Sequence, residues 1–439
     1  MINLKHTIKT MIFFKRNFLV IVALFSTFCF MAENASAERV YLDITAADVR
    51  KVVVAVPAFT GSPADNQKGQ AMAQLLGRAL EIHGFIDLVD TGRYAGMQNV
   101  DWSALGVDYA VMGKFSQTGK GMVIEGRLLD VAENRLLAGR RYRGAASQQD
   151  DMVLRLADGL IEEFTGEPGI SRTSIAYVSD VSGRKEIYIS DILGQNQKQI
   201  TKHKHLTVSP RFTPDGNYLA YTTYHRGNQD LYITDLRQNK VTRSLSRRKG
   251  MNLAPAFSPD GKEMVVTLSK DGGPDLYLLD RKGQVLKRMT SRSGINVSAS
   301  YSPDGNKIVF VSDRSGQPQI YTMDLRSGNV RRLTFKSAGT QNSEPDWSPK
   351  GDLIAFSGLV DGHNQLFTMD PQGSNVKRLT TSWGDYESPS WSPDGKLLTF
   401  TRRRNGKSEI CMIGKNGKGL RVLFSFKGNK SYPQWSPSL

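Results

Sequence analysis

Cysteine and histidine are scarce in this chain, and their scarcity excludes several kinds of site. Only 2 cysteines and 6 histidines occur in 439 residues. Cys29 lies in a segment that we predict to be removed, which leaves Cys411 without an intramolecular disulfide partner. An exported fold without disulfides must rely on a large hydrophobic core. His203 and His205 are separated by one residue, but no further Cys/His pair lies nearby in the sequence, so a solvated loop is favoured over a metal site.

The sequence also lacks a recognisable catalytic motif. Gly-x-Ser-x-Gly, which presents the nucleophile of many hydrolases, does not occur. Four aspartates recur at one position of a repeated turn, and their role in the turn explains them: Asp215, Asp260, Asp304 and Asp394. We therefore predict no catalytic residue, no metal and no cofactor.

A long hydrophobic run lies near the N-terminus, at residues 18–31, after four basic residues. The small residues Ala35, Ser36 and Ala37 follow it. This order predicts a signal peptide over residues 1–37, cleaved after Ala37, because signal peptidases need small residues at the cleavage site. The run is short for a membrane span, so a retained anchor is the weaker alternative. We expect an exported mature chain without an integral membrane segment.

Acidic residues are fewer than basic ones, 42 against 58, which gives a formal net charge of +16. Such basicity suits an anionic envelope partner such as peptidoglycan or lipid headgroups. However, the lysines and arginines are scattered through the loops between the repeats rather than clustered, which favours a solvated surface. No nucleic acid partner is predicted.

A repeat dominates the second half of the chain. An aromatic residue followed by Ser/Thr-Pro-Asp/Lys-Gly recurs at intervals of 44 to 46 residues, and the last copy is cut short by the C-terminus. A fixed period near 44 built from short β-like segments is typical of a β-propeller. The aromatic residues then pack between blades rather than form a ligand site; they are Phe212, Phe257, Tyr301, Trp347, Trp391 and Trp435.

Counting strands predicts how the propeller closes. Each period is expected to hold four strands, here called A to D; in one period these are residues 256–258, 264–268, 275–280 and 286–290. The array opens with three strands that have no A strand before them, and it ends at residues 432–436 with an A strand alone. Pairing that last strand with the first three satisfies both unpaired edges and gives six blades. The propeller is predicted over residues 170–439.

Residues 38–169 have a different pattern, which predicts an α/β domain with a mixed sheet. Apolar residues at helical spacing between Met72 and Leu80 indicate one amphipathic helix, and a second is expected after a cap at Asp150 or Asp151. Glu167-Pro168-Gly169 marks the domain boundary. Strands are expected at residues 52–56, 85–89, 109–112, 122–129 and 135–138.

Further stretches lie at both ends of the mature chain, within the α/β domain and at the domain boundary. They are residues 38–44, Trp102-Ser103-Ala104-Leu105-Gly106, Arg172-Thr173-Ser174-Ile175-Ala176-Tyr177-Val178 and Trp435-Ser436-Pro437. Together with the signal peptide and the repeats, they make the chain resemble the TolB family of periplasmic propeller proteins of the Tol-Pal system. The resemblance covers essentially the whole chain.

The resemblance implies a non-catalytic adaptor that maintains outer-membrane integrity and supports envelope constriction in cell division. In the family, one propeller mouth receives the lipoprotein Pal, and the N-terminal segment of the mature protein binds TolA. Other outer-membrane or peptidoglycan-associated partners are compatible with this role. The TolA segment corresponds to Glu38, Arg39, Val40, Tyr41, Leu42, Asp43 and Ile44. The Pal site corresponds to segments before the A strands, with Met251, Asn252, Ala254, Asn296, Val297, Gln341, Asn342, Glu344, Asp385 and Glu387.

Several alternatives stay open at this point. Each of these propeller residues can equally be part of a plain solvated loop, and residues 40–44 alternate like an edge strand that pairs with the domain's own sheet. A glycan- or small-ligand-binding propeller is the main alternative function. A hydrolase or lyase that uses the propeller channel is a further one, and it would require convergent acid/base residues there.

Overall fold

The computed structural model describes residues 50–438, except 63–64, 96, 98, 239–240 and 336–337 and the side chain of Ala254. The predicted signal peptide and residues 38–44 lie outside the described residues. Within this part of the chain, no helix is both long and apolar enough to cross a membrane.

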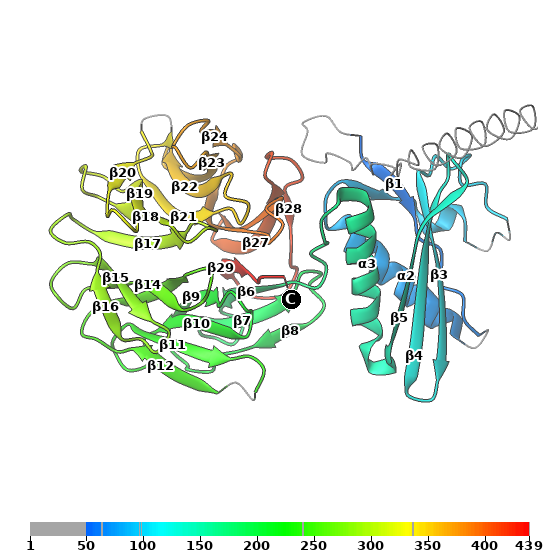
Figure 1. Cartoon of the computed structure of the whole chain (residues 1–439), viewed down its shortest axis with the longest axis horizontal. Helices are drawn as coiled ribbons and strands as arrows, with labels where there is room; N and C mark the ends of the chain where they lie inside the picture. Colours follow the sequence, from blue (N-terminus) through cyan, green and yellow to red (C-terminus); the bar gives the residue numbers. More distant parts are fainter. Residues whose placement is uncertain are drawn as a thin grey trace, which may run out of the picture. The chain divides into compact units, whose positions relative to one another are not determined.

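The first domain is a five-stranded sheet with two long helices (Figure 1). The strands lie in the order β2-β1-β3-β4-β5; β1 is parallel to β2 and β3, and the other pairs are antiparallel, so the predicted mixed sheet is confirmed. The elements are β1 (Val52–Ala55), α2 (Asn66–Glu81), β2 (Ile86–Leu88), η2 (Thr91–Arg93), β3 (Tyr109–Thr118), β4 (Gly121–Asp130), β5 (Arg135–Ala145), η3 (Ala146–Gln148) and α3 (Gln149–Thr165).

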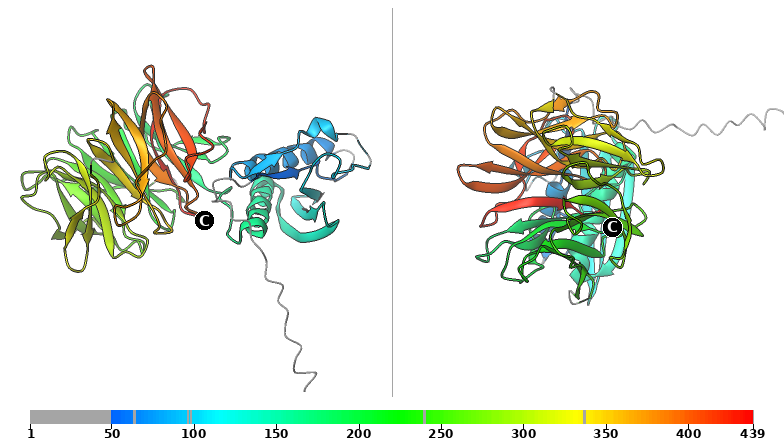
Figure 2. Two further views of the ribbon diagram at one scale, coloured as in Figure 1. Left: turned by 90° about the horizontal axis from the view of Figure 1, so that it is seen from above. Right: turned by 90° about the vertical axis from the view of Figure 1, so that its left-hand side faces the viewer.

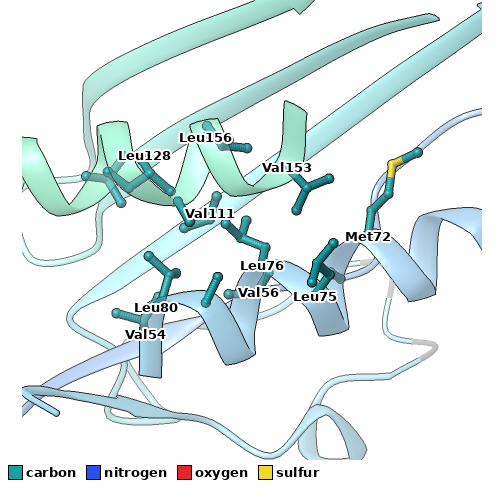
Figure 3. Packing of buried hydrophobic residues seen from close by; sticks show 14 of the residues in the cluster. Val54, Val56, Met72, Leu75, Leu76, Leu80, Val111, Leu128, Val153 and Leu156 are labelled. Carbon is teal, nitrogen blue, oxygen red and sulfur yellow. The ribbon is translucent and has the colours of Figure 1, made fainter. Parts of the chain in front are cut away.

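Both helices pack on one face of this sheet (Figure 3). Leu76 of α2 and Leu156 of α3 are fully buried there, beside Val111 and Leu128 of the sheet. Gly126 allows α3 to approach, because a Cβ at this position would lie 2.5 Å from a methyl group of Leu156. The apolar stripes of the two helices, read from their 3.6-residue spacing, therefore form the core of the domain.

The expected cap of α3 and the expected ends of two strands were wrong. The residue before α3 is Gln148, and no side chain caps the helix; Asp150 and Asp151 lie in its first turn instead. There they still favour the helix, since acidic residues interact well with its N-terminal dipole. Strands β3 and β5 continue to Thr118 and Ala145, well beyond their expected ends at Met112 and Ala138, because their later residues pair with β4 although many of them are polar.

The second domain consists of six four-stranded sheets, as predicted for a six-bladed propeller (Figure 1). From strand A to strand D, the first blade is β29 (Lys430–Trp435), β6 (Ser174–Ser179), β7 (Glu186–Asp191) and β8 (Gln197–Gln199); the second is β9 (Thr207–Phe212), β10 (Tyr218–Thr223), β11 (Asp230–Asp235) and β12 (Thr242–Ser246); the third is β13 (Asn252–Phe257), β14 (Glu263–Leu268), β15 (Asp275–Asp280) and β16 (Val285–Arg288). The fourth is β17 (Asn296–Tyr301), β18 (Lys307–Ser312), β19 (Gln319–Asp324) and β20 (Val330–Arg332); the fifth is β21 (Asn342–Trp347), β22 (Ile354–Val360), β23 (His363–Met369) and β24 (Lys377–Arg378); the sixth is β25 (Asp385–Trp391), β26 (Leu397–Arg404), β27 (Lys407–Gly414) and β28 (Arg421–Val422).

The C-terminal strand closes the ring, as the strand count predicted. β29, drawn in red, lies beside the green strand β6 and pairs with it antiparallel (Figures 1 and 2). The indole Nε1 of Trp435 donates to Thr173 Oγ1 at 2.8 Å, and the backbone of Ser436 bonds to Ser174. Residues 262 positions apart are thereby held together.

The repeated turns have the predicted chemistry. In the third blade, Asp260 accepts hydrogen bonds from Ser258 Oγ and the backbone N–H of Lys262, and these contacts lower its pKa to about 2. Gly261 leaves the turn at φ +66°, a conformation that favours glycine. In the copy with Lys350, Ser348 donates to Asp352 instead, and Gly351 keeps the same conformation, so this turn survives as expected.

The A strands begin earlier than predicted. The segments expected to be loops in front of them are the first halves of the strands, as in β13 and β17. A β-bulge interrupts every A strand after its second or third residue, and Ser298 and Glu344 adopt left-handed backbone conformations in two of these bulges. A bulge breaks the two-residue alternation that identifies a strand, which explains the late boundary.

Candidate partner-binding site

One mouth of the propeller collects two sets of connections. Because neighbouring strands within a blade are antiparallel, the loops from strand D to the next strand A and the turns from B to C all lie at the same end of the blades. We call this end the D–A mouth. The turns with Ser/Thr-Pro-Asp-Gly lie at the other end, which we call the A–B mouth. The predicted Pal-binding residues belong to the D–A mouth.

Three of the predicted residues are buried structural groups. Asn252, Asn296 and Asn342 have no exposed surface. Asn296 Nδ2 donates to Asp275 Oδ1 at 3.0 Å and to the backbone oxygen of Gly294, and Asn342 Nδ2 donates to Gln319 Oε1 at 2.9 Å. These side chains hold the D–A loops in place and do not face a partner in this conformation. Any direct contact with a partner must therefore come from the other predicted residues.

Glu344, Asp385 and Glu387 come together as an acidic sector between the fifth and sixth blades. Glu344 accepts hydrogen bonds from the backbone N–H of Ser388 at 2.6 Å and from its hydroxyl at 2.9 Å. Glu387 accepts from Asn364 at 2.8 Å and forms an ion pair with Arg403 at 3.0 Å. Asp385 accepts from the backbone N–H of Asn364 and lies 3.5 Å from His363 Nδ1.

Burial raises the pKa of carboxyl groups in and beside this sector. Removal from water raises the pKa of Glu344, and the nearby Glu387 adds to the shift, while the bonds from Ser388 oppose it. Asp346, further along the same strand, also has its pKa raised by burial. A cation or hydrogen-bond donor from a partner would relieve this cost, since a buried carboxylate is stable only when it is paired.

The remaining predicted residues are less informative. Met251 and Val297 are half-buried, and Val297 packs against a core cluster. Gln341 is exposed. The side chain of Ala254 and all seven predicted TolA-binding residues lie outside the described residues.

Sequence reasoning missed an apolar rim at the same mouth. Four D–A loops each present one exposed apolar side chain: Leu206 at 39%, Ile295 at 46%, Phe335 at 58% and Trp383 at 57%. Trp383 contacts the edge of the His363 ring, with the centroids 6.0 Å apart, which brings the apolar rim next to the acidic sector. Aligning the repeats would have shown part of this pattern, because Leu206 and Ile295 both directly precede an A strand.

A histidine pair lies on the rim of the D–A mouth between the first two blades. His203 and His225 are stacked with their ring centroids 4.8 Å apart, and their Nε2 atoms lie 3.2 and 3.4 Å from the hydroxyls of Tyr221 and Tyr232. Burial lowers the pKa of both rings. Among the described residues, no group of three or more His, Cys, Asp or Glu side chains is placed to hold a metal ion.

The A–B mouth has a hollow of ≈ 250 Å³ at the end of the channel. Arg211, Ser300, Asp346 and Gln434 line it together with prolines of the repeated turns. Two charged side chains in the hollow have hydrogen-bond partners: Asp346 accepts from the backbone N–H of Trp391 at 2.9 Å, and Arg211 donates to Pro210 O. Ser300 Oγ also donates to Asp346 Oδ1 at 3.3 Å, and no histidine is among the described residues that line the hollow.

Comparison with known families bears on both domains. A family described as "TolB amino-terminal domain" matches residues 40–137. A family described as "TolB beta propeller domain" matches residues 161–439, which is well over half of the chain. The chain belongs to the TolB family.

Individual TolB proteins are similar to parts or most of the chain. The Tol-Pal system protein TolB of Desulfotalea psychrophila is 46% identical over 219 residues, 49% of this chain and 50% of that protein. The one from Desulfosudis oleivorans is 35% identical over 52% of this chain and 54% of its own length. The chain thus matches about half the length of these curated relatives. The crystal structure of TolB from Acinetobacter baumannii superposes with a TM-score of 0.79 at 30% identity, over 89% of this chain and 98% of that one.

Proposed function

We propose that this protein is a non-catalytic adaptor of the Tol-Pal system in the periplasm. It is exported by a cleaved signal peptide, binds Pal at the D–A mouth and binds TolA through residues 38–44. In this role it maintains outer-membrane integrity and supports envelope constriction in cell division. Membership of the TolB family over both domains supports the proposal, and so does the name of the curated relatives, "Tol-Pal system protein TolB".

The apolar rim beside the acidic sector is the observation that supports this location of the binding site. Trp383 and Phe335 are each more than half exposed on loops, where most of an aromatic surface loses the benefit of burial. Aromatic anchors with polar groups around them are typical of protein–protein interfaces. A folded protein partner covers both features, whereas a small ligand would need a concave pocket lined by them.

The aromatic and acidic residues have a different role in this proposal from that of the buried asparagines. Trp383, Phe335, Glu344, Asp385 and Glu387 supply contacts, and the asparagines keep the loops in the shape that presents them. Met251, Val297, Gln341 and Ala254 stay proposed contacts at the edge of the site. An acidic sector at the mouth favours a partner segment with basic residues or N–H donors.

The first experiment measures the affinity of purified Pal for the mature protein by calorimetry. Replacing Trp383 and Phe335 together by glutamate should weaken binding more than tenfold, about 1.4 kcal/mol, because two apolar anchors become charged. Val241→Glu is the matched control: it is 64% exposed and lies in a C–D turn, at the opposite mouth. Equal affinity of the two variants would remove the D–A mouth from the proposal, and binding of peptidoglycan fragments instead of Pal would favour a glycan-binding propeller.

The second experiment deletes residues 38–44 from the mature protein and repeats the titration with TolA and with Pal. We expect TolA binding to be lost and Pal binding to be kept or strengthened. If the segment alternates between docking on its own protein and release to TolA, a Pal interaction that favours docking must oppose TolA binding by linkage. Retained TolA affinity would show that another surface binds TolA, and a large loss of Pal affinity would show that the segment supports the Pal site.

A further inference from the structure

The sheet of the first domain ends in a long strand with a free edge. β5 has 11 residues and is the last strand in the order β2-β1-β3-β4-β5. In the described part of the chain, no backbone N–H or C=O of residues 136–144 forms a hydrogen bond outside the ladder with β4. A free edge of this length is able to pair with another extended segment.

The face of the sheet opposite the helices is basic beside this edge. Cross-strand neighbours form rows there: Lys114, Glu125 and Arg141 in one, and Ser116, Val123 and Arg143 in the next. Arg127 stands in the preceding row, next to Gly139. We call Lys114, Arg127, Arg141 and Arg143 the basic face. Glu125 is the single acidic residue in these rows, and Arg141 is its ion-pair partner at 3.1 Å.

The arginines of the basic face are open to solvent. Arg127, Arg141 and Arg143 are exposed, and neither Arg127 nor Arg143 has an acidic partner within ion-pair distance among the described residues. Gly139 leaves open space beside them, because a Cβ at this position would have nothing within 4 Å. A strand added at the edge would therefore meet no steric obstacle at Gly139 and would place alternate side chains next to Arg141 and Arg143.

The charge pattern selects which segment can pair. In an antiparallel dimer of two β5 strands, the registers that pair Arg141 with Arg141 or with Arg143 would set arginine opposite arginine, and like charges directly opposite are destabilising. A neutral or basic segment would leave the arginines unpaired or repelled. An acidic segment would neutralise them while completing the backbone hydrogen bonds, so the same residues reject self-association and favour one class of partner.

We propose that β5 is a second interaction surface, which binds an acidic, extended polypeptide segment by strand addition. The segment places Asp or Glu at alternate positions over the basic face and extends the sheet to six strands. Strand addition obtains affinity from main-chain hydrogen bonds and specificity from alternate side chains. This surface does not depend on the D–A mouth or on residues 38–44.

The experiment titrates the mature protein with three peptides of about twelve residues. A Glu-Thr repeat has both the charge and the ability to form a strand; a Gln-Thr repeat lacks the charge; a Glu-Pro repeat keeps the charge but lacks half of the N–H donors and cannot join a sheet. We expect binding of the Glu-Thr repeat only, weakened by salt, with slower amide hydrogen exchange at residues 136–144.

Two charge-reversed variants test the location. Arg127→Glu with Arg143→Glu should weaken binding of the Glu-Thr repeat at least tenfold. Arg281→Glu with Lys282→Glu makes the same change of charge at exposed residues of a C–D turn in the propeller and should change affinity less than twofold. Thermal melting of both variants checks that they are folded.

Four results would overturn the proposal. Equal binding of the Glu-Pro repeat would mean non-specific charge attraction. Exchange protection at residues other than 136–144 would place the site elsewhere. Binding to anionic phosphatidylglycerol vesicles but not to the Glu-Thr repeat would assign the basic face to a lipid surface. Binding of the peptide only after deletion of residues 38–44 would identify the chain's own segment as the occupant.

Discussion

A threonine near the end of a D strand ties the outer strands of a blade together. Thr334 Oγ1 donates to Gln319 Oε1 at 2.7 Å and accepts from the backbone N–H of Ile320 at 2.9 Å. Thr290 makes the same two contacts with Asp275 and Leu276 in the preceding blade. Each threonine is buried, so these bonds satisfy groups that would otherwise lose their water partners at a cost of about 1–3 kcal/mol each.

The asparagines of the D–A mouth complete the same network, and this explains why their role was not predicted. Asn296 and Asn342 donate to the acceptors that Thr290 and Thr334 also use, on the neighbouring C strands. A sequence shows that a polar residue recurs before a strand, but it does not show that the acceptor on another strand lies within 3 Å. Glu344 and Asp385 were predicted at the same mouth; Glu344 lies in the bulge of β21 and Asp385 begins β25, and both are partly exposed.

His83 gives the first domain a pH-dependent contribution to stability. It is buried, its Nε2 accepts from the backbone N–H of Ile170 at 3.1 Å, and burial lowers its pKa from 6.5 to about 4. Since the folded pKa lies below the unfolded one, the contribution is complete above pH 6.5 and is lost as the pH falls toward 4. A difference of this size corresponds to roughly 3 kcal/mol.

We predict that His83→Gln removes this part of the acid sensitivity, because glutamine can accept the same bond without a proton to gain. Urea unfolding between pH 7.5 and 4 measures it: the advantage of the unmodified protein over the variant should shrink as the pH falls. His205→Gln, at an exposed position, is the control and should leave the pH profile unchanged. Parallel profiles for the unmodified protein and His83→Gln would contradict the prediction.

At the scale of a strand, a proline accompanies the bulge in five of the six A strands. Five of the six copies have proline two residues before the aromatic residue, and the fourth blade has Ala299 at this position. The bulge leaves two A-strand residues opposite one B-strand residue, so the proline needs no ladder hydrogen bond. These prolines are visible in the sequence, yet the A strands were predicted to start after the bulge instead of before it.

We predict that Ala299→Pro stabilises the protein by about 0.4–1 kcal/mol, because it restricts the unfolded chain at a site where proline fits. The preceding residue Ser298 has φ +54°, the same as Ser209, which does precede a proline. Ala355→Pro is the control; it lies in the interior of β22, pairs on both sides and should destabilise the blade strongly. Urea midpoints compare the variants, and a lower midpoint for Ala299→Pro would mean that its N–H is needed.

For the whole molecule, the period and the strand count were enough to predict six blades and the closing strand. These properties follow from chain order, since three strands at the start and one at the end can satisfy their edges only by meeting. The apolar rim could not be predicted in the same way. Leu206, Ile295, Phe335 and Trp383 lie on four separate loops, and only the ring brings them to one mouth.

Removal of the closing strand should open the ring. A chain that ends at Asn429 lacks β29, so β6 has an unpaired edge and the bonds of Trp435 to Thr173 and of Ser436 to Ser174 are lost. We expect a loss of stability greater than that of Trp435→Ala, which alone should cost about 3–5 kcal/mol for a buried tryptophan. Thermal melting and amide exchange of β6 measure it, and a chain that ends at Ser436 is the control because it keeps the closing strand. If the chain ending at Asn429 melts within a degree or two of the full-length protein, the ring does not depend on β29, and the six blades must be held together by contacts between neighbouring blades alone.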